Sequence, residues 1–166
     1  MRNLIAAPVI ILAVMVQSAI VSRITLLSGA ADLPLVMLAA WALQDEVDAA
    51  WHWAVGVGIL VGFVSGIHWS VPLLSYLTVV LFAQLFQRRV WQAPLLAMFS
   101  VTFLGTIAMN VFSLVVLRVF GIALPLSDVL GLVTLPSILL NMLLAIPAYA
   151  VMRDLARWVY PTPEVE

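Results

Sequence analysis

The sequence predicts an all-α integral membrane protein, a bundle of six transmembrane helices that forms a single domain over residues 1–166. Apolar residues make up 65% of the chain and charged residues only 9%, whereas soluble domains are roughly 45–50% apolar and about 25% charged. The chain has no lysine, and its few charges leave long uncharged stretches. A soluble fold could not cover its surface with so few charges, and so much apolar surface would not stay disordered, so both classes are excluded.

The predicted spans are the uncharged stretches, because a helix needs about 20 apolar residues to cross a bilayer. The stretch 49–87 is too long for one crossing, and it contains the turn-forming segment Ser65–Pro72. We therefore divide it into two spans. The six spans lie near residues 3–22, 33–48, 49–64, 72–87, 93–117 and 135–156.

The second span is the shortest apolar run. Leu33–Leu43 would cover only about 16 Å at ~1.5 Å per residue. Asp32 is expected to cap its N-terminus, with Pro34 in the first turn. We expect the helix to continue through the acidic segment to residue 48; the alternative is a five-span protein in which this segment is re-entrant.

The two ends of the chain carry further signals. We expect the first span to stay as an anchor, because no small-x-small cleavage site follows its long apolar run. Thr134 is expected to cap the last span, with Pro136 in its first turn and Pro147 inside the helix.

Arginines predict the orientation. With Met1 inside, five arginines fall at cytoplasmic span ends and two outside, as the positive-inside rule requires. Both termini are then cytoplasmic. The inner arginines are Arg2, Arg88, Arg89, Arg153 and Arg157, of which the last four are the strongest topology anchors; the outer ones are Arg23 and Arg118.

The third span contains a ridge of small residues. Ala50, Ala54, Gly58, Gly62 and Gly66 recur every four residues and so share one helix face. Small residues let another helix backbone approach closely, which favours association in lipid. Two interpretations remain open, namely packing within this bundle and docking of a partner's transmembrane helix.

Neutral polar residues recur at four-residue spacing in two spans, with Thr102, Thr106 and Asn110 in the fifth and Ser137 and Asn141 in the sixth. Such side chains normally face the bundle interior, because lipid offers them no hydrogen-bond partner. Hydrogen bonds between helices and recognition of a ligand are both consistent with this pattern. Gln17 in the first span has the same two interpretations.

Residues that perform catalysis are not grouped in the sequence. There is no cysteine, and His52 and His68 lie at opposite ends of the third span, about 24 Å apart by helical rise, too far to share a metal. Asp32 and Asp128 are expected at the outer boundary. We therefore expect no catalytic site, no metal site and no cofactor, and the scattered arginines predict no nucleic-acid partner.

Several segments resemble the rod shape-determining protein MreD family. They are Val16–Ile24 with Ala31–Val36, the Gly-Phe-Val-Ser-Gly run 62–66, and the closing Leu-Pro-Ser-Ile-Leu-Leu-Asn-Met-Leu-Leu run that begins at Leu135. The resemblance covers nearly the whole chain, and the Pro-Ser-x3-Asn run is its most specific part. Many members carry an aspartate at the position of Gly62.

The resemblance implies a non-enzymatic, multi-pass component of the bacterial cytoplasmic (inner) membrane. Such proteins act in the cell-elongation machinery, which directs peptidoglycan synthesis and rod shape. They contact MreC and, through it, MreB, RodA and a class B penicillin-binding protein. Contact residues would be the small and amide residues Ala54, Gly58, Gly62, Gly66, Asn110, Ser137 and Asn141.

The family's fold is similar to the six-helix substrate-binding subunit of energy-coupling-factor transporters. That similarity implies the alternative function, a small-molecule (vitamin-like) binding subunit of a membrane transporter. Such subunits commonly meet their cytoplasmic partner through an Ala-x3-Ala pair in the first helix. The alanines of the first span here, at positions 6, 7, 13 and 19, do not have that spacing.

Overall fold

The computed structural model describes residues 2–45, 47, 50–87, 93–122 and 124–160, with side chains from residue 8 onward. The chain is almost entirely helical, as the sequence predicts. Among the described residues, three helices are long and apolar enough to cross a membrane, namely Ser70–Gln87, Pro94–Val119 and the continuous helical segment Leu126–Val159. The protein is therefore an all-α membrane protein.

The elements follow one another with short connections. In chain order they are α1 (Arg2–Ala19), a 3-10 turn (Val21–Arg23), the two-stranded hairpin β1 (Thr25–Leu26) and β2 (Gly29–Ala30), α2 (Leu33–Ala42), α3 (Ala50–Val64), α4 (Ser70–Gln87), α5 (Pro94–Val119), α6 (Leu126–Asp128), a π-helical segment (Val129–Thr134) and α7 (Leu135–Val159).

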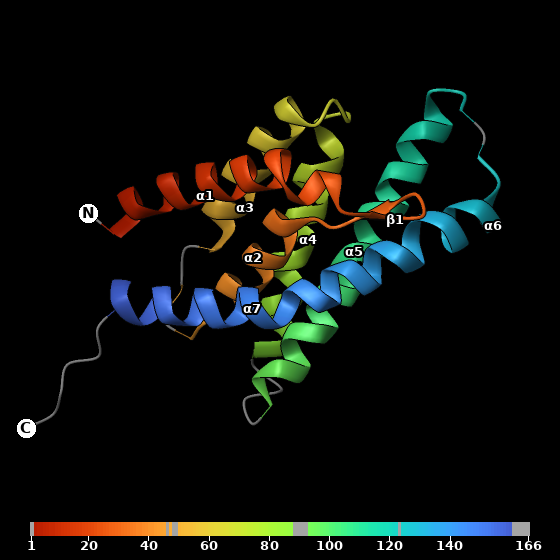
Figure 1. Ribbon diagram of the computed structural model, residues 1–166. Helices are drawn as coiled ribbons and strands as arrows, with labels where there is room; N and C mark the ends of the chain where they lie inside the picture. Colours follow the sequence, from red (N-terminus) through yellow and green to blue (C-terminus); the bar gives the residue numbers. More distant parts are fainter. Residues whose placement is uncertain (1, 46, 48–49, 88–92, 123, 161–166) are drawn as a thin grey trace, which may run out of the picture.

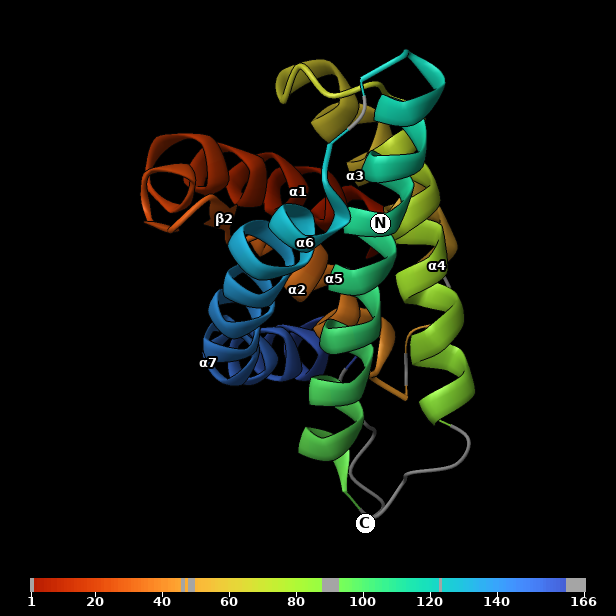
Figure 2. The same cartoon turned by 90° about the vertical axis from the view of Figure 1, so that its right-hand side faces the viewer.

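The helices are arranged in two crossing layers. Figure 1 shows α1 and α7 running across the view, while α4 and α5 cross them steeply. In Figure 2, α4 and α5 stand side by side, and α1 and α7 run into the depth of the picture. The helix α2 lies between the layers and contacts α1, α3, α4, α5 and α7.

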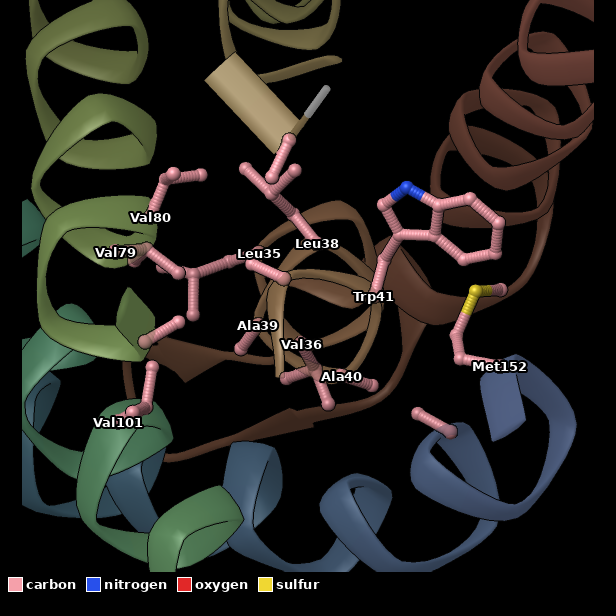
Figure 3. Packing of buried hydrophobic residues seen from close by; sticks show 14 of the residues in the cluster. Leu35, Val36, Leu38, Ala39, Ala40, Trp41, Val79, Val80, Val101 and Met152 are labelled. Carbon is pink, nitrogen blue, oxygen red and sulfur yellow. The ribbon is translucent and has the colours of Figure 1, made fainter. Parts of the chain in front are cut away.

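The core is built around α2. Eight of its ten residues are buried, from Pro34 to Ala42. Figure 3 shows Val79 and Val80 of α4 on one side of α2, while on the other side the Trp41 side chain of α2 extends toward Met152 of α7. Buried aliphatic side chains of this kind pack at the density of protein interiors, so α2 fixes the relative positions of the two layers.

The start of α2 agrees with the sequence, but its end does not. Asp32 caps the N-terminus, since its carboxylate accepts a hydrogen bond from the Leu35 N–H at 3.0 Å. The helix ends at Ala42 instead of continuing to residue 48. The side chain of Gln44 turns back and donates to the Ala40 carbonyl at 2.8 Å, which satisfies one of the carbonyls that a helix end leaves free.

The last α-helix begins at Leu135, as the sequence predicts, but a π-helical segment leads directly into it, so its start is not capped as expected. Thr134 does not cap it, because its backbone is helical (φ −68°) and its hydroxyl donates to the Val129 carbonyl at 3.0 Å. The chain is helical from Leu126 to Val159. Pro136 lies in the first turn of α7 and Pro147 lies inside the helix, both as predicted, and the π-helical segment ends at Thr134, two residues before Pro136.

Candidate functional site

The small residues of α3 pack against α4. Ala54 is fully buried. A Cβ added at Gly58 would lie 2.8 Å from Cα of Leu73, and one added at Gly62 would lie 2.8 Å from Cα of Trp69. These glycines let the α4 backbone approach α3 closely, so the face they form is already covered within the chain.

Gly66 does not belong to this contact. It lies two residues beyond the end of α3 with φ +67°, and nothing lies within 4 Å of a Cβ added there. The positive φ is one that glycine adopts without strain, so this residue serves the turn between α3 and α4. The four-residue spacing in the sequence assigned Gly66 to the ridge, because that spacing does not show where the helix ends.

The structure places two of the four predicted topology anchors. Arg153 and Arg157 are exposed near the end of α7, and Arg153 forms an ion pair with Asp154 at 3.5 Å. Arg88 and Arg89 lie outside the described residues.

The polar residues of α5 and α7 meet in one hydrogen-bond network, centred on Asn141, which is 1% exposed. Its Oδ1 accepts from the backbone N–H of Asp32 at 2.7 Å, and its Nδ2 donates to Oγ1 of Thr106 at 2.9 Å. Thr106 donates to the Thr102 carbonyl, and Nδ2 of Asn110 donates to the Thr106 carbonyl. Asn110 and Asn141 therefore both bond to Thr106, and the network joins α5, α7 and the start of α2.

The carboxylate of Asp32 is part of the same network. Besides capping α2, it accepts a hydrogen bond from the hydroxyl of Tyr76 on α4, whose oxygen lies 3.1 Å from Oδ1 and 3.2 Å from Oδ2. The sequence placed Asp32 at the outer boundary and did not single out Tyr76. The available signal was that a tyrosine in an apolar span needs a hydrogen-bond partner for its buried hydroxyl.

The hairpin between α1 and α2 docks on α7 through backbone groups. Pro136 has no N–H, so the Leu132 carbonyl four residues earlier has no regular helical donor, and the Ser28 N–H donates to it at 3.0 Å. The Ala30 N–H donates to Oγ of Ser137 at 3.2 Å. Ser137, which is 6% exposed, thus holds the hairpin.

Gly29 allows this docking, and sequence reasoning missed it. A Cβ added at Gly29 would lie 2.7 Å from the Ser137 nitrogen and 2.7 Å from the Val133 carbonyl oxygen. Only a residue without a side chain fits between the hairpin and the helix. Gln17 of α1 holds the other side of the loop, since its amide donates to the Ala31 carbonyl and accepts from the Leu33 N–H, both at 2.8 Å.

A cavity of about 340 Å³ lies beside the network. It is lined by the 28–32 loop and by parts of α1, α2, α3, α5 and α7, and polar side chains and apolar ones such as Val61 and Met109 share its wall. Volumes of about 300–1,000 Å³ are typical of small-molecule sites. Asn110, Ser137 and Asn141, three of the residues singled out in the sequence, all line it.

The two histidines lie near opposite ends of α3, and Nδ1 of His68 lies 2.7 Å from Oγ of Ser70. His52 is exposed, and the His68 ring lies 5.8 Å from that of Trp69 and 5.7 Å from that of Phe120. Within the part of the chain that the structure describes, no three His, Cys, Asp or Glu residues are grouped so that they could hold a metal ion.

Comparison with known protein families, with characterised proteins and with solved structures finds no match to this chain.

Proposed function

We propose that the chain is a non-enzymatic scaffold of the bacterial cell-elongation machinery, held in the cytoplasmic membrane. It would act through transmembrane helix contacts with MreC and, through MreC, with MreB, RodA and a class B penicillin-binding protein. The resemblance of its sequence to the MreD family is the reason for naming these partners. The proposal includes six membrane crossings with both termini cytoplasmic.

The single structural observation that supports a contact function is the difference between the polar interior of the bundle and the apolar outer face of α7. Amide and hydroxyl groups of the spans bind each other and the 28–33 loop, as described above. The outward face of α7 is aliphatic, with Leu135, Leu139 and Leu143 at four-residue spacing and 59%, 62% and 71% exposed. A rigid interior with an apolar outer helix face suits binding of another transmembrane helix, where packing drives association.

The α7 stripe, defined here as Leu135, Leu139 and Leu143, is the surface we assign to MreC. It lies in the segment that most resembles the MreD family. The alternative surface, the ridge of Gly58 and Gly62, is covered by α4 and so is not available to a partner.

Site-specific photo-cross-linking tests this proposal. We expect p-benzoylphenylalanine in place of Leu143 to give an adduct with MreC in cells, and the same residue in place of Val115, which is 53% exposed on α5, to give none. Depletion of the protein should turn rod-shaped cells round. Normal rods after depletion would contradict the elongation role. An adduct at Val115 alone would move the contact to α5.

The cavity favours a second candidate, a small-molecule-binding subunit of a membrane transporter. Native mass spectrometry of the detergent-purified protein would show a retained ligand of vitamin size, and depletion would then lower uptake of that ligand while leaving cell shape unchanged. Those two results together would replace the scaffold proposal.

A further inference from the structure

The cavity beside Asn141 has an unbalanced charge. Asp32 lines it, and none of its lining residues is an arginine, lysine or histidine. The donors that reach the Asp32 carboxylate, the Leu35 N–H and the Tyr76 hydroxyl, are neutral and leave its negative charge in place. A carboxylate in a site of low dielectric attracts a cation and repels an anion far more strongly than it would in water.

Two further groups on the wall have spare hydrogen-bonding capacity. Ser137 Oγ accepts from Ala30 N–H, but among the described residues nothing accepts the Ser137 hydroxyl proton. Nδ2 of Asn110 donates to the Thr106 carbonyl, while its Oδ1 has no donor in the described part of the chain. Each is able to bind a polar ligand group without breaking the network that holds the fold.

We propose that this cavity is a binding site for a small organic cation, an ammonium compound with a polar substituent. Asp32 supplies the counter-charge, and Asn110 and Ser137 hydrogen-bond the substituent. The volume of about 340 Å³ accommodates a molecule of this size. The inference rests on the cavity alone and holds whether the chain acts as a scaffold or as a transporter subunit.

The chain contains no cysteine, so single-cysteine variants report on one position each. Ser113→Cys places a thiol on the cavity wall, and Ser100→Cys is its matched control: both serines lie on α5 and donate to the carbonyl four residues earlier, but Ser100 lies outside this cavity. Each thiol is modified with two methanethiosulfonate reagents, one carrying a cationic trimethylammonium group and one an anionic sulfonate group. The ratio of the cationic to the anionic rate is then divided by the same ratio measured for the free thiol 2-mercaptoethanol in solution.

At Ser113→Cys we expect the cationic reagent to be favoured about tenfold beyond the solution ratio, in line with charge focusing in clefts. Adding Asp32→Asn should remove the preference, because asparagine keeps the helix cap and the acceptor for Tyr76 but carries no charge. Tyr76→Phe, which keeps the charge, should retain it. An unmodified thiol at Ser113→Cys, or a preference that survives Asp32→Asn or also occurs at Ser100→Cys, would overturn the proposal.

Protection by a ligand provides the second test. Choline and its uncharged isostere 3,3-dimethylbutan-1-ol are compared for slowing the reaction of Ser113→Cys with the neutral reagent methyl methanethiosulfonate. We expect choline to slow modification at least fivefold at a concentration where the alcohol has no effect, and Asp32→Asn to abolish that protection. Equal protection by both compounds, or by neither, would show that the site does not select a cation.

Discussion

Asn141 lies where α5, α7 and the loop before α2 meet, and both the oxygen and the nitrogen of its side-chain amide form hydrogen bonds. The oxygen accepts from the Asp32 N–H and the nitrogen donates to Thr106. A hydrophobic residue in its place would leave a backbone N–H and a hydroxyl without these partners. At the residue scale, the stability of the fold therefore depends on groups that are satisfied by another element and not by their own helix.

We predict that Asn141→Leu lowers the free energy of unfolding by about 1–3 kcal/mol, because buried donors and acceptors lose their partners. Ser113→Ala is the control: its hydroxyl donates only to the Met109 carbonyl of its own helix, so its effect should stay within about 0.5 kcal/mol. Unfolding by SDS titration in mixed micelles measures both. Equal stabilities for the two variants would show that the amide contributes nothing.

Gly29→Ala should release the hairpin from α7, because the added Cβ would meet backbone atoms of Ser137 and Val133 at 2.7 Å. Gly131→Ala, on the helical segment it docks against, should be neutral or slightly stabilising, since nothing lies within 4 Å of its Cβ position. Limited proteolysis within residues 24–31 gives the readout. Faster cleavage of Gly131→Ala than of Gly29→Ala would reverse this assignment.

At the scale of elements, α3 and α4 are held together by the absence of side chains. Leu73 of α4 and Trp69, the residue just before α4, approach the Gly58 and Gly62 backbone closely enough that even a methyl group would displace them. In lipid, where burial of apolar surface drives no association between helices, such close packing is a main source of attraction.

Alanine at two α3 glycines should consequently have opposite effects. Gly62→Ala is expected to destabilise the protein by about 1–3 kcal/mol through overpacking against Trp69. Gly56→Ala, on the exposed face of the same helix, should stabilise it by about 0.5–1 kcal/mol through helix propensity. Thermal unfolding in detergent measures the sign of each change. If both variants shift the midpoint upward, the α3–α4 contact is looser than described.

At the scale of the whole molecule, α2 has only 10 residues but contacts every other long helix. It cannot cross about 30 Å of hydrocarbon by itself. The helix lies between the layers, and eight of its ten residues are buried among neighbouring helices. The surrounding protein therefore compensates for its short length.

Reporter fusions test the proposed crossings. With six spans and a cytoplasmic N-terminus, alkaline phosphatase joined after Asp45 should be inactive and after Ile67 active, while a C-terminal green fluorescent protein should be fluorescent. A re-entrant α2 would exchange the first two results.

Local patterns predicted the helical class, the Asp32 cap and the break after Val64, because each depends on residues close together in sequence. They also singled out Ser137 and Asn141, since polar groups in an apolar run need partners. They did not identify those partners. The Ser137 and Asn141 bonds reach back to Ala30 and Asp32, separations of 107 and 109 residues that no local pattern encodes.

The two errors at helix ends have a similar origin. The end of α2 is set by Gln44 returning to the Ala40 carbonyl, and Thr134 continues the last helix because its hydroxyl finds the Val129 carbonyl. Both side chains could equally have capped or extended a helix, and the local sequence does not decide between those uses.

The docking of the hairpin on α7 has a consequence for biosynthesis. The N–H groups of Ser28, Ala30 and Asp32 find their partners only in residues 132–141, which leave the ribosome more than a hundred residues later. Until then the α1–α2 connection is incompletely bonded, and α2 lacks the helix that covers one of its sides. The first part of the chain to be inserted is thus among the last to reach its native structure, and its maturation depends on the arrival of the final helix.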